Sequence, residues 1–207
     1  MTIKWLYRAL EESRARGFLG PAEISTQIEH ATGFSRVWDD FSPTAPSEFL
    51  DLGSGGGLPG LVLLESWQCS ATLVDSMVKR TTFLDEVLHW EGAPSQGRVV
   101  NGRAEVLSRL PGFKEGFQLV TARSFGPPAV TAECAVRFLR LNGLLIVSEP
   151  PDDEGVDRWD PAGLTKIGMR SEGRVRKGAA FQILRKVRST PSGFPREVGI
   201  PGKSPLF

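Results

Sequence analysis

The sequence predicts an α/β fold with a mainly parallel sheet and helices on both of its faces. Two observations support this: short apolar strand patterns alternate with helical patterns, and a glycine-rich loop follows the first strand pattern. Such alternation is typical of parallel strands joined by crossover helices. The predicted strands cover residues 48–52, 71–75, 98–101, 117–122 and 143–148, and the predicted helices cover 59–66, 77–90, 103–109 and 127–140.

The alternating core has a segment on either side. Residues 1–42 are helix-prone and predict an N-terminal helical extension. A run rich in proline and serine at 42–47 leads into the core, which we expect to span 43–190. Residues 191–207 are basic and rich in proline and glycine, so they are predicted to form a separate tail.

The loop after the first predicted strand indicates a nucleotide-binding site. Residues 49–60 read Phe-Leu-Asp-Leu-Gly-Ser-Gly-Gly-Gly-Leu-Pro-Gly, with Pro59 placed where the helix begins. Glycine allows the backbone to approach a ligand closely, and proline fits a first helical turn. Residues 55–60 also satisfy the dinucleotide pattern G-x-G-x-x-G, with Asp75 lying 20 residues beyond Gly55.

The acid at the end of this strand, Asp51, distinguishes two ligand classes. A dinucleotide would place its pyrophosphate at the helix N-terminus, where Asp51 would repel it. S-adenosylmethionine (AdoMet) has no phosphate and carries an ammonium and a sulfonium, which a carboxylate attracts. Asp75 suits either ligand, since a carboxylate can accept hydrogen bonds from both ribose hydroxyls. The loop therefore favours AdoMet as the cofactor, with a nicotinamide dinucleotide as the alternative.

The end of the core completes the predicted topology. Residues 164–172 and 179–188 are predicted to be antiparallel strands joined through Gly173 and Gly178. A parallel sheet followed by a terminal antiparallel pair is expected of the class I (Rossmann-like) AdoMet-dependent methyltransferase fold. Ligands of such sheets bind outside the carboxyl ends of the strands.

Charge is unevenly distributed along the chain, although the net charge is only +1. Residues 158–207 hold eleven lysines and arginines against three acids, whereas 149–157 hold five acids and no base. A basic C-terminal third is a candidate phosphate-binding surface, and a merely solvated basic face would have the same composition.

The remaining composition sets the expected environment. Cys69 and Cys134 lie in apolar contexts without metal-ligand spacing, so we expect buried thiols and no metal site. The N-terminus carries no apolar signal segment, and no apolar run approaches membrane-spanning length. We therefore expect a cytoplasmic protein without a membrane contact.

Five segments together form a specific combination of motifs. They are residues 49–60, Leu73–Leu84, Gly102–Glu105, Thr121–Phe125 and Phe194–Leu206. The Leu-Pro-Gly, Arg-Ala-Glu and Ala-Arg-Ser-Phe motifs are more specific in combination than the loop alone. This combination resembles the bacterial RsmG (GidB) family of small-subunit 16S ribosomal RNA guanine-N7 methyltransferases. Ser148–Glu154 stands where that family usually has a lysine-glycine segment, which indicates a divergent member.

The resemblance implies roles for the residues at the matching positions. Gly53 and Leu58 are expected to line the methionine and nucleoside side of AdoMet, and Asp75 is expected to hold the ribose hydroxyls. Ala104 and Glu105 are expected to lie on either side of the adenine. The full set of expected cofactor contacts is Asp51, Gly53, Gly55, Leu58, Asp75, Ala104, Glu105 and Arg123.

The catalytic and RNA-binding residues are likewise inferred from the resemblance. Arg123 is expected to be catalytic, and an arginine directly after an apolar strand is costly unless it is paired or faces a cleft. RNA contacts are expected from Arg103, Arg196 and Lys203. Arg103 could instead pair with Glu105 or Asp85 on the surface.

The implied reaction is methyl transfer from AdoMet to N7 of a guanine in 16S ribosomal RNA. The expected partner is ribosomal RNA or the small ribosomal subunit, and the enzyme is expected to be a monomer. N7 of neutral guanine has an available lone pair, so no general base is needed. Three alternatives remain: a methyltransferase acting on another RNA, one acting on a small molecule, and a noncatalytic RNA- or ribosome-binding relative.

Overall fold

A seven-stranded sheet forms the centre of the computed structural model, which describes residues 4–151 and 158–207. The strand order is β3-β2-β1-β4-β5-β7-β6; β1 to β5 are parallel, and β7 is antiparallel to both β5 and β6. The strands are β1 (Glu48–Leu52), β2 (Ser70–Asp75), β3 (Gly97–Asn101), β4 (Phe117–Ala122), β5 (Leu139–Glu149), β6 (Met169–Lys177) and β7 (Ala179–Lys186).

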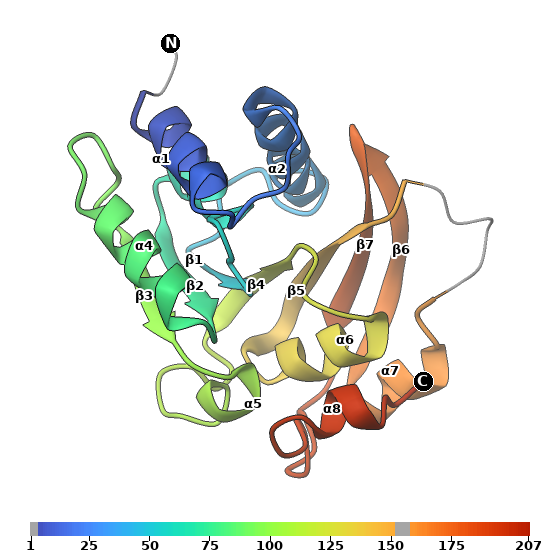
Figure 1. Ribbon diagram of the computed structural model, residues 1–207. Helices are drawn as coiled ribbons and strands as arrows, with labels where there is room; N and C mark the ends of the chain where they lie inside the picture. The colour runs from blue at the N-terminus through green and yellow to red at the C-terminus, as the bar shows by residue number, and fades with distance from the viewer. Residues whose placement is uncertain (1–3, 152–157) are drawn as a thin grey trace.

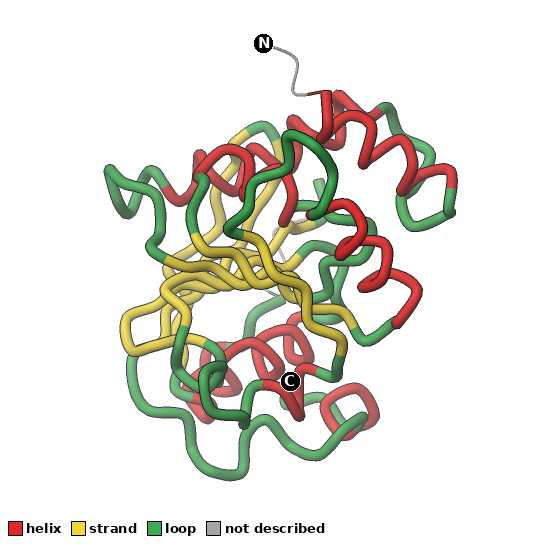
Figure 2. The backbone as a smooth tube through the Cα atoms, turned by 90° about the vertical axis from the view of Figure 1, so that its left-hand side faces the viewer, coloured by secondary structure: helices red, strands yellow, loops and turns green. Residues whose placement is uncertain are grey.

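Helices cover both faces of the sheet, so the molecule has three layers (Figures 1 and 2). One face carries α1 (Lys4–Ala15), α2 (Ile24–Trp38), α3 (Gly60–Trp67) and α4 (Val78–Leu88). The other carries α5 (Ala104–Leu107), α6 (Pro128–Val136), α7 (Pro161–Ile167) and α8 (Ile200–Lys203). The predicted class I methyltransferase fold is confirmed by this architecture.

Side chains of β1 alternate between the two layers, as strand geometry requires. Leu50 and Leu52 pack with the cluster under α5 to α8, whereas Phe49 packs with α2 and α3 on the opposite face. Asp51 shares the face of Phe49 by this alternation, and it lies beside Thr121 of β4 in the sheet register. A polar side chain is thereby placed within an otherwise apolar layer.

The N-terminal helices are part of the packed core. Trp5 and Leu6 of α1 join the buried cluster that contains Leu61 and Phe83, and Phe34 of α2 packs against the sheet. The predicted helical content of residues 1–42 agrees with α1 and α2. The division of the chain at 42 and 190 stays a prediction.

The structure corrects the predicted strand at 164–172. Residues Pro161–Ile167 form α7, and β6 begins only at Met169. Asp160 caps the helix by accepting a hydrogen bond from the Gly163 amide at 2.6 Å, and Gly168 ends it with a φ of 87°. An acid followed by proline at the start and glycine at the end is the usual signature of a helix.

Two smaller corrections concern neighbouring elements. The hairpin turn between β6 and β7 is made at Gly178 alone, because Gly173 lies within β6 at a shift of register. The predicted helix 127–140 ends at Val136, and the chain then enters β5 at Leu139, which pairs with Phe117. The other predicted core elements are present with small shifts at their ends.

The tail after β7 folds back over α6. Arg196 forms an ion pair with Glu133 of α6, at 2.6 Å between Nη2 and Oε2, and its backbone amide donates to Oε1 of the same carboxylate at 2.7 Å. Arg137 and Arg109 donate to backbone carbonyls of the tail. Because Glu133 is fully buried, its charge depends on Arg196 for compensation.

We expect Arg196→Ala to lower the free energy of unfolding by about 3 kcal/mol, since it leaves the buried Glu133 carboxylate without its countercharge. Urea denaturation followed by circular dichroism measures this. Arg170→Ala is the matched control, because Arg170 is 63% exposed in its pair with Glu172 and should change stability by less than about 1 kcal/mol. Equal effects of the two substitutions would contradict the assignment.

Candidate functional site

The glycine loop after β1 lies tightly against its neighbours. The amides of Gly53 and Ser54 both donate to the carbonyl of Val74 in β2, at 2.8 and 2.9 Å. Gly53 has a φ of 73°, and a Cβ atom there would come within 2.6 Å of the Phe125 ring. A side chain would therefore be both strained and obstructed at this position. The loop backbone is held where it can face a ligand.

Asp51 anchors this loop from behind. Its Oδ2 accepts from the Gly60 amide at 3.0 Å, and its Oδ1 accepts from the Thr121 hydroxyl at 2.8 Å. The side chain is buried, and burial raises its pKa to about 6, although these hydrogen bonds partly oppose the shift. The carboxyl thus ties the start of α3 to β4.

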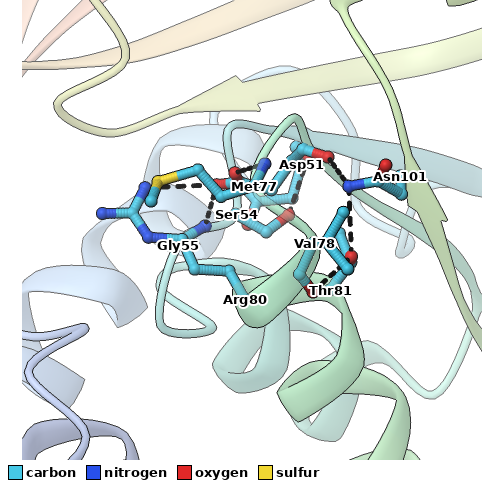
Figure 3. Close-up of polar contacts among 9 residues, drawn as sticks. Asp51, Ser54, Gly55, Met77, Val78, Arg80, Thr81 and Asn101 are labelled. Carbon is cyan, nitrogen blue, oxygen red and sulfur yellow. Dashed lines mark hydrogen bonds and ion pairs between the residues drawn. The ribbon is translucent and has the colours of Figure 1, made fainter.

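Asp75 ends β2 and organises the opposite side of the loop. Its Oδ2 accepts from the Gly55 amide at 3.0 Å, and its Oδ1 accepts from the Met77 amide at 2.8 Å. Arg80 lies 3.4 Å from Oδ2. Figure 3 shows Gly55, Met77 and Arg80 gathered together, with Asn101 on the other side of the group. Capping of α4 and contact with a ligand are compatible roles for this carboxylate.

Glu105 supplies a second acid at the start of α5. It is buried and accepts from the Arg103 guanidinium at 3.0 Å and from the Gly199 amide at 3.1 Å. Burial opposes its charge, but the hydrogen bonds and the Arg103 charge outweigh burial and lower its pKa. Glu105 therefore remains ionised at neutral pH, and it connects α5 to the tail.

These groups surround a cavity of about 270 Å³ at the carboxyl ends of the parallel strands. Its wall combines the two acids with apolar side chains and with glycines of the tail. The lining residues are Leu52, Gly53, Val74, Asp75, Ser76, Met77, Arg80, Gly102, Arg103, Ala104, Glu105, Ser124, Phe125, Val130, Cys134, Gly199 and Gly202. Such a mixture can enclose a flat apolar ring while holding hydroxyl and amine groups at its edge.

The cavity brings together part of the predicted cofactor set. Gly53, Asp75, Ala104 and Glu105 line it, together with Arg103, which was predicted to contact RNA. The residues of the predicted set outside its wall are Asp51, Gly55, Leu58 and Arg123. Asp51 and Gly55 hold the loop, and Leu58 is buried in the core. Their contacts with a cofactor stay predictions.

Other cavity residues were not singled out from the sequence. Ser124 and Phe125 belong to the recognised Ala-Arg-Ser-Phe motif, but only its arginine was assigned a role. Gly199 and Gly202 come from the tail, more than ninety residues after Glu105. Their position at the cavity could not be predicted from the sequence, because no local pattern indicates a contact between residues so far apart in the chain.

Arg123 lies beside the cavity in a second polar group. Its Nη2 is 3.4 Å from Oε1 of Gln27 in α2, and its buried Nη1 has no hydrogen-bond partner among the described residues. Burial lowers the pKa of this guanidinium, and the Asp51 charge partly opposes the shift. His30 Nε2 lies 3.0 Å from the Ser148 hydroxyl, and burial and the Arg123 charge lower the His30 pKa.

The predicted RNA-binding residues have different surroundings. Lys203 is exposed at the end of α8. Arg103 is 52% exposed but is paired with Glu105, the alternative that the sequence had left open. Arg196 is occupied by Glu133. RNA contacts of these three residues stay predictions, and the ion pair supplies a structural role for Arg196.

Residues 4–151 and 158–207 contain no group of three or more histidine, cysteine, aspartate or glutamate side chains that could hold a metal ion. Within the same ranges, none of the helices has the length and apolar character needed to cross a membrane.

Comparison with known proteins points to one family. The family model described as GidB, rRNA small subunit methyltransferase G, matches residues 16–152. Ribosomal RNA small subunit methyltransferase G of Symbiobacterium thermophilum is 34% identical, covering 76% of this chain and 69% of the relative. The protein of the same name from Streptococcus uberis is 32% identical, covering 78% of this chain and 70% of the relative.

Solved structures support the fold. A Corynebacterium glutamicum protein has a TM-score of 0.58 and 21% identity, covering 92% of this chain and 93% of that chain. A mutant of MtNAS in complex with S-adenosylmethionine has a TM-score of 0.59 and 12% identity, covering 88% of this chain and 73% of that chain.

The raised pKa of Asp51 predicts a pH-dependent stability. Between about pH 4 and about pH 6, the folded state holds a proton that the unfolded state has lost, so stability falls as the pH rises. Relative to Asp51→Asn, the wild type should lose on the order of 3 kcal/mol of unfolding free energy over this range. Denaturation at a series of pH values measures the difference.

Thr121→Val provides the matched control for this titration. It removes the hydroxyl that stabilises the Asp51 carboxylate while preserving the shape of the side chain, so the fall in stability should extend to higher pH. A stability difference between the wild type and Asp51→Asn that is constant with pH would contradict the prediction.

Proposed function

Because the chain belongs to the GidB family, rRNA small subunit methyltransferase G, we propose that it transfers a methyl group from AdoMet to N7 of a guanine in 16S ribosomal RNA. The observation that carries the proposal is the cavity at the carboxyl ends of the strands, where two acids and an apolar wall lie beside Arg123. This position is the usual ligand site of open α/β sheets.

The residues of the cavity fit AdoMet. Asp75 keeps acceptor capacity beyond its two amide donors and would hold the ribose hydroxyls. Glu105 would accept a hydrogen bond from the exocyclic amine of adenine. The apolar side chains of Leu52, Val74 and Val130 would enclose the ring. When bound, AdoMet supplies an electrophilic methyl group on its sulfonium.

The acceptor requires no activation by the protein. N7 of guanine is a hydrogen-bond acceptor with a free lone pair, so a general base is unnecessary. The one thiol that lines the cavity is inert as a nucleophile, because burial raises the pKa of Cys134 to about 12. Catalysis would rest on placement of the acceptor, which can contribute roughly 7–11 kcal/mol.

Arg123 is suited to orient the reacting groups. It follows β4 at the edge of the cavity, and its buried Nη1 donates to none of the described residues. A buried donor without a partner is costly, so a group that enters the site and accepts its hydrogen bond would be favoured. Arg123 would thus bind an acceptor atom of the cofactor or of the target base.

A basic surface near the site is suited to bind the RNA backbone. Arg174 and Arg176 on β6 are directed to the segment after β5, since they donate to the carbonyls of Pro150 and Pro151 at 2.9 and 2.7 Å. Lys203 lies exposed on the tail. Phosphate contacts from such residues would make RNA binding weaken as the salt concentration rises.

The proposal is tested by methyl transfer from labelled AdoMet to small ribosomal subunits, and to their purified RNA, that lack the native N7 methyl group. Chemical cleavage at 7-methylguanine then maps the product. We expect label at one guanine. Asp75→Asn serves as the cofactor-site control, with weaker AdoMet binding expected by calorimetry. Binding of AdoMet by the wild type without transfer to RNA would indicate a different acceptor.

Arg123→Ala should reduce transfer by about 100-fold or more, since it removes a preorganised donor at the reacting groups. The melting temperature should change little, because the 3.4 Å contact with Gln27 is the one hydrogen bond that the guanidinium makes with the described residues. Single-turnover kinetics and thermal denaturation measure the two effects. Arg170→Ala, on exposed β6, is the control, and wild-type turnover by Arg123→Ala would exclude the role.

A further inference from the structure

A second cavity lies beside the cofactor cavity at the carboxyl end of β5. It measures about 280 Å³, and it shares Ser124 and Phe125 with the first cavity. The shared residues follow β4, so the two cavities meet at the edge of the sheet where Arg123 also lies. A molecule in the second cavity would therefore face the group held in the first across this common wall.

Among the described residues, one buried acid lines the second cavity. Glu149 is 6% exposed at the end of β5. Its Oε2 accepts from the Arg158 guanidinium at 2.9 Å, and its Oε1 accepts from the Trp159 indole at 3.2 Å. A carboxylate offers about two acceptor positions on each oxygen, so these contacts leave acceptor capacity on both.

The pairing also adjusts the charge of the site. Arg158 offsets the negative charge of Glu149, so the acid adds little repulsion toward the phosphates of an approaching RNA. The indole of Trp159 fixes the second oxygen. The carboxylate is thus held in place as an acceptor of hydrogen bonds at the wall of the cavity.

From this arrangement, and resting on the proposed function, we infer that Glu149 recognises the Watson–Crick edge of the acceptor guanine. Guanine presents two adjacent donors there, the N1–H and the 2-amino group, which match the two oxygens of a carboxylate. N7 lies on the other side of the purine. A base held at Glu149 directs N7 toward the wall shared with the cofactor cavity.

The same contact accounts for base selectivity. Adenine presents an unprotonated N1 on this edge, which would set an acceptor against the buried carboxylate. A site built to receive hydrogen bonds rejects an analogue that lacks the donor, because its own polar group is left unpaired. Glu149 is therefore a specificity-determining residue, and Arg158 and Trp159 position it.

The test compares guanosine with inosine at the mapped position of small-subunit ribosomal RNA. Inosine keeps N7 and N1–H but lacks the 2-amino group. The wild type should methylate guanosine about 10- to 100-fold faster than inosine, the range expected for a hydrogen bond to a charged group. Glu149→Gln should slow transfer to guanosine by a similar factor and bring the guanosine-to-inosine ratio toward one.

Two controls separate recognition from folding. Glu172→Gln removes an ion-paired acid on β6 outside both cavities, and it should keep the wild-type ratio. Calorimetry should show unchanged AdoMet binding by Glu149→Gln. The comparison of guanosine with inosine in the wild type needs no variant, so it stands even if Glu149→Gln folds poorly.

The outcomes distinguish this inference from the proposed function. Equal wild-type rates on guanosine and inosine, or an unchanged ratio in Glu149→Gln, would overturn recognition by Glu149 while leaving the methyl transfer intact. A Glu149→Gln variant that slows both substrates equally would also overturn it, because only a structural role is then needed. Absence of wild-type transfer to RNA would overturn both.

Discussion

The buried carboxyl of Asp51 is the contact on which the rest of the site depends. One oxygen receives the amide that starts α3 and the other receives a hydroxyl from β4, so β1, α3 and β4 meet at one side chain. The glycine loop between β1 and α3 is thereby fixed in position at the carboxyl end of β1. Gly55 of that loop in turn holds Asp75, which faces the cavity. Asp51, which is itself outside the cavity, therefore helps to fix the position of Asp75 in the cavity wall.

The order of the strands explains why two cavities lie side by side. β1 and β4 are neighbours in the sheet but are far apart in the sequence, and the helices that follow them cover opposite faces. The chain segments beyond these strands diverge, which opens a crevice at their carboxyl ends. Ser124 and Phe125 follow β4 into this crevice and separate its two compartments. Reactants bound on either side would have little freedom to meet in another orientation.

Local patterns were sufficient to predict most of the core. Apolar strands and a glycine loop are encoded over a few residues, so β1, the loop and Asp75 could be located without tertiary information. The strand predicted at 164–172 begins only at Met169, because the Asp160-Pro161 start and the Gly168 end define a helix over Pro161–Ile167. A short buried helix and a strand share the same composition, and the capping residues distinguish them.

The sequence was less informative about residues whose partners are distant. Arg196 belongs to a basic run and was predicted to bind RNA, but its nearest partner is a buried acid of α6 that no spacing rule relates to it. Glu149 was treated as part of an acidic stretch, whereas the structure places it in a cavity wall with Arg158 and Trp159. The remainder of that stretch, residues 152–157, lies outside the described residues. A run of charged residues in the sequence does not indicate which of its members become buried or paired in the folded chain.

The tail has a consequence for the synthesis of the protein. Gly199 and Gly202 complete the wall of the cavity beside Glu105, and the Gly199 amide donates to the Glu105 carboxylate. A chain emerging from the ribosome exposes the glycine loop early and these residues late. The wall of the cavity is therefore incomplete until these residues have been synthesised. A ligand can be fully enclosed there only after the tail has packed against α6.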